Sequence, residues 1–238
     1  MRIVAVSSGK GGVGKSTVAF LLAKSLSQKK RVLLLDFDIT GPSVSTLMKN
    51  PSESVIMKET LTPIKKTDTL SYLTIAAMIP IDSPVIWKAP KKLSLLSLFM
   101  KSADPSLFDF LVIDMPPGST DEQNFLCEIS GAEIVIVTTS QNLALDEAES
   151  VIEVYKEAGK EILGVIENMR EMACPECGEK ISVFSKNGGK MLSESVGVRY
   201  LGHIDQISRV EDLPGLPSSV SSLLGLLLDD ETHPEKSE

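Results

Sequence analysis

Ser8 to Thr17, close to the start of the chain, combine several glycines with two lysines and hydroxyl side chains. The spacing from Gly9 to Ser16 is G-x-x-x-x-G-K-S, which is typical of a loop that cradles phosphates. Glycines let the backbone N–H groups turn inward, Lys15 supplies a positive charge to the β- and γ-phosphates, and Ser16 can bind Mg²⁺. We therefore predict a nucleoside triphosphate site formed by Gly9, Lys10, Gly11, Gly12, Val13, Gly14, Lys15, Ser16 and Thr17.

The residues on both sides of this loop support that interpretation. Ile3–Ser7 is a short apolar run that predicts a buried strand. Lys15–Gln28 has apolar residues at helical spacing and predicts a helix that begins inside the loop. A helix N-terminus carries a partial positive charge, which adds to the attraction for a phosphate. A glycine-rich turn with chance spacing is the alternative, and it requires neither flanking element.

Aspartates end two other apolar runs, Val32–Asp36 and Phe110–Asp114. A carboxylate at a strand end beside a phosphate loop is suited to holding Mg²⁺, directly or through water. We predict Asp114 as the metal-side carboxylate. Asp38, two residues past its strand, is predicted to orient or deprotonate the attacking water and to contribute to the Mg²⁺ site with Ser16. The alternative is that each aspartate only caps the next helix.

Cysteines occur at positions 127, 174 and 177. Cys174 and Cys177 form a C-x-x-C pair, which places two thiolates on one side of a tight turn where one metal centre can bind both. A zinc ribbon needs a second such pair, which the chain lacks, and a thioredoxin-like redox pair needs a different context. Cys127 lies in an apolar helical stretch and is predicted to be a small core residue.

The composition is that of an ordinary globular α/β protein of 238 residues with 42% hydrophobic residues. The formal net charge is −8, and a binder of duplex DNA would normally carry a basic stripe. Apolar runs stay shorter than a membrane span, and no signal peptide precedes the first strand. We expect a cytoplasmic protein with neither nucleic acid nor membrane as partner.

Apolar strand candidates alternate with helical stretches along the chain, and most strand candidates are continuous apolar runs. This order predicts a doubly wound, mostly parallel sheet with helices on both faces, in one domain over 1–228, followed by a flexible tail over 229–238. The predicted strands are Ile3–Ser7, Val32–Asp36, Tyr72–Ala76, Phe110–Asp114, Ile134–Thr138, Leu163–Glu167 and Tyr200–His203. The predicted helices are Lys15–Gln28, Lys91–Lys101, Asp121–Ile129, Leu145–Ala158, Gly189–Val196 and Ser218–Leu228. Residues 48–68 are predicted to form a loop or short helix.

Together these motifs resemble the Mrp/ApbC (Nbp-type) branch of the MinD/ParA/ArsA class of P-loop ATPases. The likeness extends over nearly the whole chain because the motifs occur in family order. They are, in order, Lys10–Thr17, Asp38–Ser43, Pro84–Pro90, Asp114–Asp121, Glu167–Met169, Cys174–Cys177 and Leu201–Ile204.

The resemblance implies an ATP-hydrolysing carrier of iron–sulfur clusters that works as a homodimer and passes its cluster to recipient apoproteins, in contact with scaffold proteins. It implies that Lys10 reaches the partner's nucleotide and that Asn168 reads the adenine edge. A [4Fe–4S] cluster takes four thiolates, which two chains supply if Cys174 and Cys177 lie at a two-fold axis. The expected cofactors are thus ATP, Mg²⁺ and a labile bridging [4Fe–4S] cluster.

Two alternatives remain open at this stage. Zinc could occupy the same bridging cysteine site in a regulatory ATPase. A MinD- or ParA-like positioning ATPase would instead bind membrane or DNA, although the run Ser221–Asp230 is apolar and then acidic, which disfavours anionic lipid.

Overall fold

The structure, a computed structural model, describes residues 1–39, 41–48, 60–77, 89–118, 120–207, 209–210 and 213–229. Thr40, Trp87 within the motif Pro84–Pro90, and the tail from residue 230 lie outside the described residues. Most of the polar segment predicted over 48–68 lies outside them as well.

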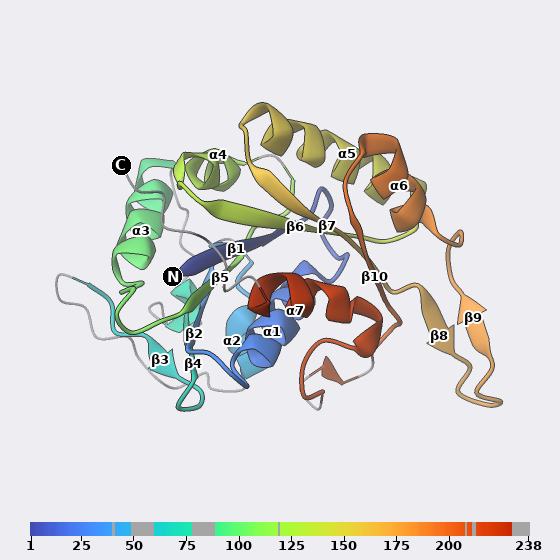
Figure 1. Ribbon diagram of the computed structural model, residues 1–238, viewed down its shortest axis with the longest axis horizontal. Helices are drawn as coiled ribbons and strands as arrows, with labels where there is room; N and C mark the ends of the chain where they lie inside the picture. The colour runs from blue at the N-terminus through green and yellow to red at the C-terminus, as the bar shows by residue number, and fades with distance from the viewer. Residues whose placement is uncertain are drawn as a thin grey trace.

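An eight-stranded sheet forms the centre of the described chain, in the order β10-β7-β6-β1-β5-β2-β4-β3 (Figure 1). Every neighbouring pair is parallel except the edge pair of β3 and β4, which is antiparallel. The predicted doubly wound, mostly parallel sheet is confirmed. The strands are β1 Arg2–Ser7, β2 Val32–Asp36, β3 Ile64–Lys65, β4 Leu70–Leu73, β5 Phe110–Asp114, β6 Ala132–Thr138, β7 Glu161–Asn168 and β10 Tyr200–Ile204.

Helices cover both faces of this sheet (Figure 1). One apolar layer packs α1 and α7 against the sheet, and the opposite layer packs α3, α4, α5 and α6 against it. The helices are α1 Lys15–Leu26, α2 Val44–Met48, α3 Ala89–Lys101, α4 Asp121–Glu128, α5 Asn142–Glu157, α6 Gly188–Val196 and α7 Ser221–Leu228. Among the described residues no helix combines the length and the apolar character needed to cross a bilayer.

The central strands are buried on both faces, which explains their continuous apolar sequences. In the register of the sheet, Asp36 at the end of β2 lies opposite Asp114 at the end of β5. The loop after β1 lies at the same edge, because the strands run parallel. The fold thus gathers the predicted phosphate loop and both aspartate segments at the carboxyl edge of the sheet.

Four local predictions were wrong or incomplete. The strand predicted over Tyr72–Ala76 is β4, Leu70–Leu73, and the chain then turns into a 3-10 helix, Ile75–Ala77. Thr74 lies at this turn and donates its hydroxyl hydrogen bond to the buried carboxylate of Asp36, at 3.0 Å. The apolar run predicted a longer strand because a contact with a distant residue leaves no mark in the local sequence. Helix α2 was not predicted, and neither was β3, which lies within the segment 48–68 that was predicted as a loop or short helix.

A small antiparallel hairpin was also missed. It consists of β8 Glu171–Ala173 and β9 Lys180–Ser182, and it projects from the body of the molecule beside β10 (Figure 1). Each strand has three residues, too few for a recognisable alternation of polar and apolar side chains. The hairpin carries Cys174 and Cys177 in its connecting turn.

The tight packing of the sheet can be tested by a substitution at Gly164 in β7. Its φ is 149°, and an added Cβ would overlap the backbone carbonyl of Arg199. We expect Gly164→Ala to cost about 2 kcal/mol or more in unfolding free energy, because strain and overlap add. Gly225→Ala in α7 is the matched control, since its Cβ would meet only Asp229 at an ordinary 3.5 Å. Equal stability of the two variants in urea unfolding would contradict this account.

Candidate functional site

The loop between β1 and α1 adopts the backbone shape that its glycines permit. Gly12 and Gly14 have φ of 83° and 85°, in the left-handed region that favours glycine. Gly14 is the N-cap of α1, so the free N–H groups of the first helical turn point toward the loop. The sequence prediction of a glycine turn leading into a helix N-terminus is confirmed.

A cavity of about 290 Å³ lies over this loop. It is lined by most of the residues from Ser8 to Thr17 together with Asp38, Ser43 and Pro117. Lys10, Lys15, Ser16, Thr17 and Asp38 thus come together around one space. The cavity has the amide and ammonium donors that a polyphosphate needs, and it opens at the carboxyl edge of the sheet.

Lys15 and Asp114 form a buried ion pair at the back of this cavity. The distance from Lys15 Nζ to Asp114 Oδ1 is 2.6 Å, and the side chains are 6% and 0% exposed. Lys15 Nζ also lies 3.2 Å from Ser16 Oγ. Burial raises the pKa of Asp114, while the charge of Lys15 opposes that rise. Asp114 Oδ2 is buried and has no hydrogen-bond partner among the described residues.

Asp36 is a functional-site residue that the sequence interpretation missed. It is fully buried and accepts hydrogen bonds from the amides of Asp38 and Val44, both at 3.2 Å, and from the Thr74 hydroxyl. Burial, followed by the negative charge of Asp114, raises the pKa of Asp36 well above its usual range. Asp36 therefore holds the start of the Asp38–Ser43 segment. The sequence did contain a sign of this role, because the strands that end at Asp36 and Asp114 both finish in an aspartate.

Asp38 lies at the mouth of the cavity, half-buried. Its Oδ1 accepts the amide hydrogen of Gly41 at 2.9 Å, which shapes the turn that follows. Because this residue lines the same cavity as the phosphate loop, it is placed where the sequence interpretation expects a water-orienting carboxylate. That role stays a prediction.

The two lysines of the loop have different surroundings. Lys10 is half-buried, and its Nζ lies 3.4 Å from Gln141 Oε1, at the start of α5. Gly9, just before it, packs so closely on α5 that an added Cβ would overlap the backbone of Glu147. Lys15 instead points inward to Asp114. The separate roles predicted for the two lysines stay a prediction.

Asn168, at the end of β7, lies behind the loop. It is 4% exposed, and its Nδ2 donates to the backbone carbonyl of Val13 at 2.8 Å. Its amide also fills the space where a side chain on Gly14 would lie. Asn168 therefore supports the phosphate loop here, a contact that the sequence did not indicate. Its predicted role at the adenine stays a prediction.

Cys174 and Cys177 lie apart from the cavity, in the turn between β8 and β9. Cys174 is half-buried and Cys177 is exposed, and both are free. The Cys177 amide and then the Glu176 amide donate toward the Cys174 sulfur, and these bonds lower the pKa of its thiol. Such a turn favours a thiolate, which is the form that binds metal.

Cys127 lies in α4 at the edge of an apolar layer. It is half-buried and packs against the core rather than within it, so the prediction of a core residue is only partly correct. Burial raises the pKa of its thiol.

Within the described residues, no three His, Cys, Asp or Glu side chains come together as a metal site. The cysteine turn of one chain therefore offers two thiolates without a third ligand from that part of the chain.

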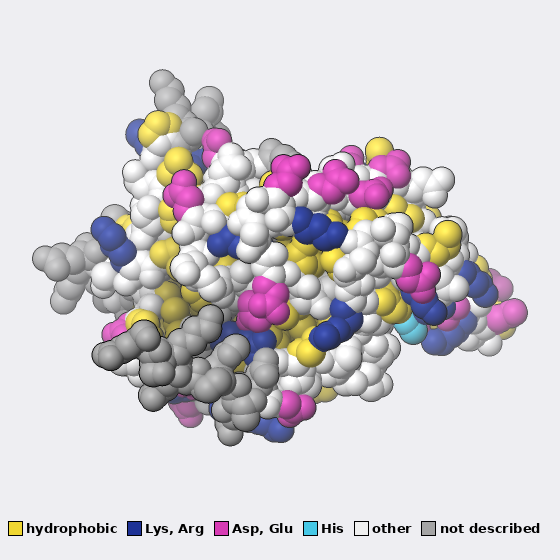
Figure 2. Space-filling model, turned by 45° about the horizontal axis from the view of Figure 1, so that its top comes forward, with side chains coloured by type: hydrophobic (Ala, Val, Ile, Leu, Met, Phe, Trp, Pro, Cys, Tyr) yellow, Lys and Arg dark blue, Asp and Glu magenta, His cyan; other side chains and the backbone are white. Residues whose placement is uncertain are grey.

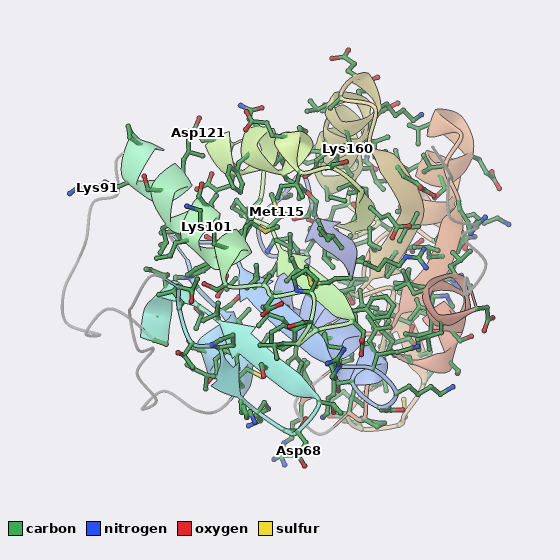
Figure 3. The ribbon with its side chains drawn as sticks, turned by 60° about the vertical axis from the view of Figure 1, so that its left-hand side comes forward. Asp68, Lys91, Lys101, Met115, Asp121 and Lys160 are labelled. Carbon is green, nitrogen blue, oxygen red and sulfur yellow. The ribbon has the colours of Figure 1, made fainter. Side chains whose placement is uncertain are left out.

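Figure 3 shows the side of the molecule with α3 and α4, where Met115 lies in the interior and Lys91 points away from the body. Met115 is fully buried, which fixes the chain directly after Asp114.

The raised pKa of Asp36 gives stability a pH dependence with a definite sign. An acid whose pKa is higher in the folded chain loses stability as the pH rises from its unfolded pKa to its folded pKa. Asp36→Asn should therefore gain stability relative to the unchanged protein as the pH rises from about 4, the ordinary pKa of an aspartate, to about 7, by up to about 1.4 kcal/mol for each pH unit below the raised pKa. Urea unfolding without nucleotide measures this. A stability difference that is the same at both pH values would contradict it.

The family model and the most similar curated relatives all concern iron transfer or iron–sulfur cluster assembly. Residues 1–214 match the family described as "ParA: NUBPL iron-transfer P-loop NTPase". The iron-sulfur cluster carrier protein of Aquifex aeolicus is 41% identical over 85% of this chain, which spans 57% of that relative's length. The cytosolic Fe-S cluster assembly factor Nubp2 homolog of Drosophila ananassae is 37% identical over 92% of this chain and 87% of that protein.

A solved structure agrees with these relatives. The nucleotide-binding protein of Archaeoglobus fulgidus, in complex with ADP and with cobalt, has a TM-score of 0.73 and 29% identity, over 90% of this chain and 86% of that one. The predicted resemblance and the predicted class of P-loop ATPase are confirmed. The chain belongs to the ParA/NUBPL family of iron-transfer P-loop NTPases.

Proposed function

We propose that this protein is a cytosolic ATPase that holds a labile [4Fe–4S] cluster between two copies of the chain and passes it to apoproteins. The observation that carries the proposal is the exposed turn with Cys174 and Cys177, on a chain whose loop, cavity and ion pair are those of a P-loop ATPase. The relatives' names, an iron-sulfur cluster carrier and a cytosolic assembly factor, support it.

At the nucleotide, the backbone amides of the loop and the N-terminus of α1 bind the phosphates. Lys15 contributes a full charge to the β- and γ-phosphates. Asp114, Ser16 and Asp38 supply the oxygen donors that suit Mg²⁺, and the unpartnered Oδ2 of Asp114 fits that assignment. When bound, Mg²⁺ neutralises phosphate charge. Asp38 orients the water whose oxygen bonds to the γ-phosphorus as the bond to the leaving ADP oxygen breaks.

Lys10 acts on the nucleotide of the partner chain. It is held by a long contact to Gln141 and lines the open cavity, so little must be broken for it to move. A second ammonium group would stabilise the charge that develops on the phosphates during hydrolysis. Dimerisation and hydrolysis are then linked through this one side chain.

The cluster is the cargo rather than a permanent part of the protein. Two thiolates from each chain complete the four ligands of a [4Fe–4S] cluster, and a two-fold axis brings the two turns together. The exposure of Cys177 leaves the cluster open to exchange with a recipient apoprotein or with a scaffold protein. Zinc is the alternative occupant, because Cys₄ sites also bind zinc.

A positioning ATPase of the MinD or ParA type is less well supported. Figure 2 shows acidic side chains along the upper part of the view, over α5. Asp146, Glu149, Glu153 and Glu157 are exposed on that helix. A surface of this charge repels nucleic acid and anionic lipid. The match to an iron-transfer family also favours the carrier.

Replacement of Lys10 should separate binding from hydrolysis. We expect Lys10→Ala to change the Kd for Mg·ATP less than about threefold and to lower the maximal hydrolysis rate about 10²-fold, as the loss of a charge-stabilising donor does. Lys15→Ala is the control, because it should abolish binding. Isothermal titration and phosphate release measure the two quantities. Equal loss of binding in both variants would refute a separate role for Lys10.

The cysteine pair is tested by anaerobic reconstitution with iron and sulfide. We expect about four iron and four sulfide per two chains, and a near-complete loss in the double variant Cys174→Ala with Cys177→Ala. Cys127→Ala is the matched control and should bind as much as the unchanged protein. A double variant that binds as much cluster, or zinc in place of iron in protein purified without oxygen, would overturn the cluster assignment.

A further inference from the structure

Glu167 belongs to the motif Glu167–Met169 but has no part in the site described above. It is fully buried at the end of β7, next to Asn168. Its Oε1 accepts the hydroxyl hydrogen bond of Ser140 at 2.7 Å, and its Oε2 accepts the Gly189 amide at 3.1 Å and the Tyr200 hydroxyl at 3.5 Å. This buried carboxylate therefore joins three segments of the chain, and we call Glu167 with Ser140, Gly189 and Tyr200 the Glu167 junction.

One of these segments is the start of α6. Gly189 donates directly to Glu167, and the Gly188 amide donates to Ser140 Oγ at 3.0 Å. The carboxylate thus satisfies a helix N-terminus, where negative charge is stabilising. The junction has no spare room: a Cβ on Gly189 would lie 2.8 Å from that of Glu167, and one on Gly188 would lie 2.9 Å from Ser140 Oγ. A shift on one side must therefore move the other.

The nucleotide loop touches both neighbours of this junction. Asn168, the residue after Glu167, donates to the Val13 carbonyl inside the loop. Gln141, the residue after Ser140, is the contact of Lys10. Any change in the loop when a nucleotide binds thus acts on the chain directly beside the Glu167–Ser140 pair.

The cysteine hairpin is attached to the other side of the junction. The segment 169–187 leaves from Asn168, runs through β8 and β9, and returns to Asn187, the N-cap of α6. Arg170 ties the two ends together: its Nη2 donates to Asn187 Oδ1 at 2.8 Å. Figure 1 shows this hairpin reaching away from the sheet beside α6 and β10. Both ends of the segment with Cys174 and Cys177 are therefore fixed at the Glu167 junction.

We propose that Glu167 is a positioning residue that couples the nucleotide loop to the cysteine hairpin. The proposal rests on the proposed function for the nature of the cargo, but the coupling itself is a property of the protein without cargo. Nucleotide binding in the loop shifts the Glu167–Ser140 pair and changes the local opening of the hairpin. Because binding free energies are reciprocal, metal bound at the cysteines then changes nucleotide affinity by the same factor as the nucleotide changes metal affinity.

Hydrogen–deuterium exchange of the full chain, with and without Mg·ADP, tests the coupling. In the unchanged protein we expect Mg·ADP to alter exchange of amides in 170–187 about fivefold or more, which is the lower range of allosteric coupling. Glu167→Gln keeps the shape but replaces one acceptor oxygen by a donor, so it should lose most of this response while still binding Mg·ADP. Ser140→Ala, a milder change at the same junction, should reduce the response in part.

Glu133→Gln is the matched control. Glu133 is a largely buried carboxylate on β6, paired with Arg2 at 2.6 Å, and its variant should respond to Mg·ADP as the unchanged protein does. The reverse arm measures the Kd for Mg·ADP with and without Co²⁺, whose absorption reports binding to the thiolates. Co²⁺ should change this Kd in the unchanged protein and not in Glu167→Gln, and an equal effect in both would count against the proposal. The proposal would be overturned if Mg·ADP left amide exchange in 170–187 unchanged in the unchanged protein. It would also be overturned if Glu167→Gln and Ser140→Ala both showed the full change in exchange. If the protein bound no cluster but its hairpin exchange still responded to Mg·ADP, only the proposed carrier function would be wrong.

Discussion

The buried ion pair between Lys15 and Asp114 is the interaction on which the site depends. Each charge removed from water costs several kcal/mol, so neither side chain is stable there without the other. Their contact ties the first turn of α1 to the last residue of β5 and holds the phosphate loop open over its cavity. Asp36, beside them, is fully buried and accepts three hydrogen bonds, and its burial raises its pKa. The loop is therefore formed before any phosphate arrives.

Parallel strands impose the second constraint. Because β1, β2, β5, β6 and β7 all end at one edge, the loop, both aspartate segments, Gln141 and Asn168 lie around the same region. The cysteine hairpin begins shortly after Asn168, with β8 at Glu171, and its return to α6 meets Glu167. The nucleotide site and the cysteine turn are thus separate in space but joined through one short stretch of chain.

The sequence predicted the parts of the structure that local pattern controls. The strands that end at Asp36 and Asp114, the glycine turn at Gly12 and Gly14, and the helix that starts at Lys15 were all predicted, because buried strands and phosphate loops have strong signatures. The contacts of Asn168 with Val13, of Lys10 with Gln141 and of Glu167 with α6 were not. They join residues far apart in the chain, and no spacing rule encodes them. Asp36 was passed over in favour of Asp38 because burial depends on the neighbouring strand.

We propose that two chains share one cluster through Cys174 and Cys177. Native mass spectrometry of anaerobically reconstituted protein can decide this, because it weighs chains and cluster together. We expect the mass of one [4Fe–4S] cluster only on the species with two chains. Mixing with chains that lack both cysteines should remove the cluster from the mixed dimers. A cluster carried by single chains, or retained by mixed dimers, would rule out a shared cluster.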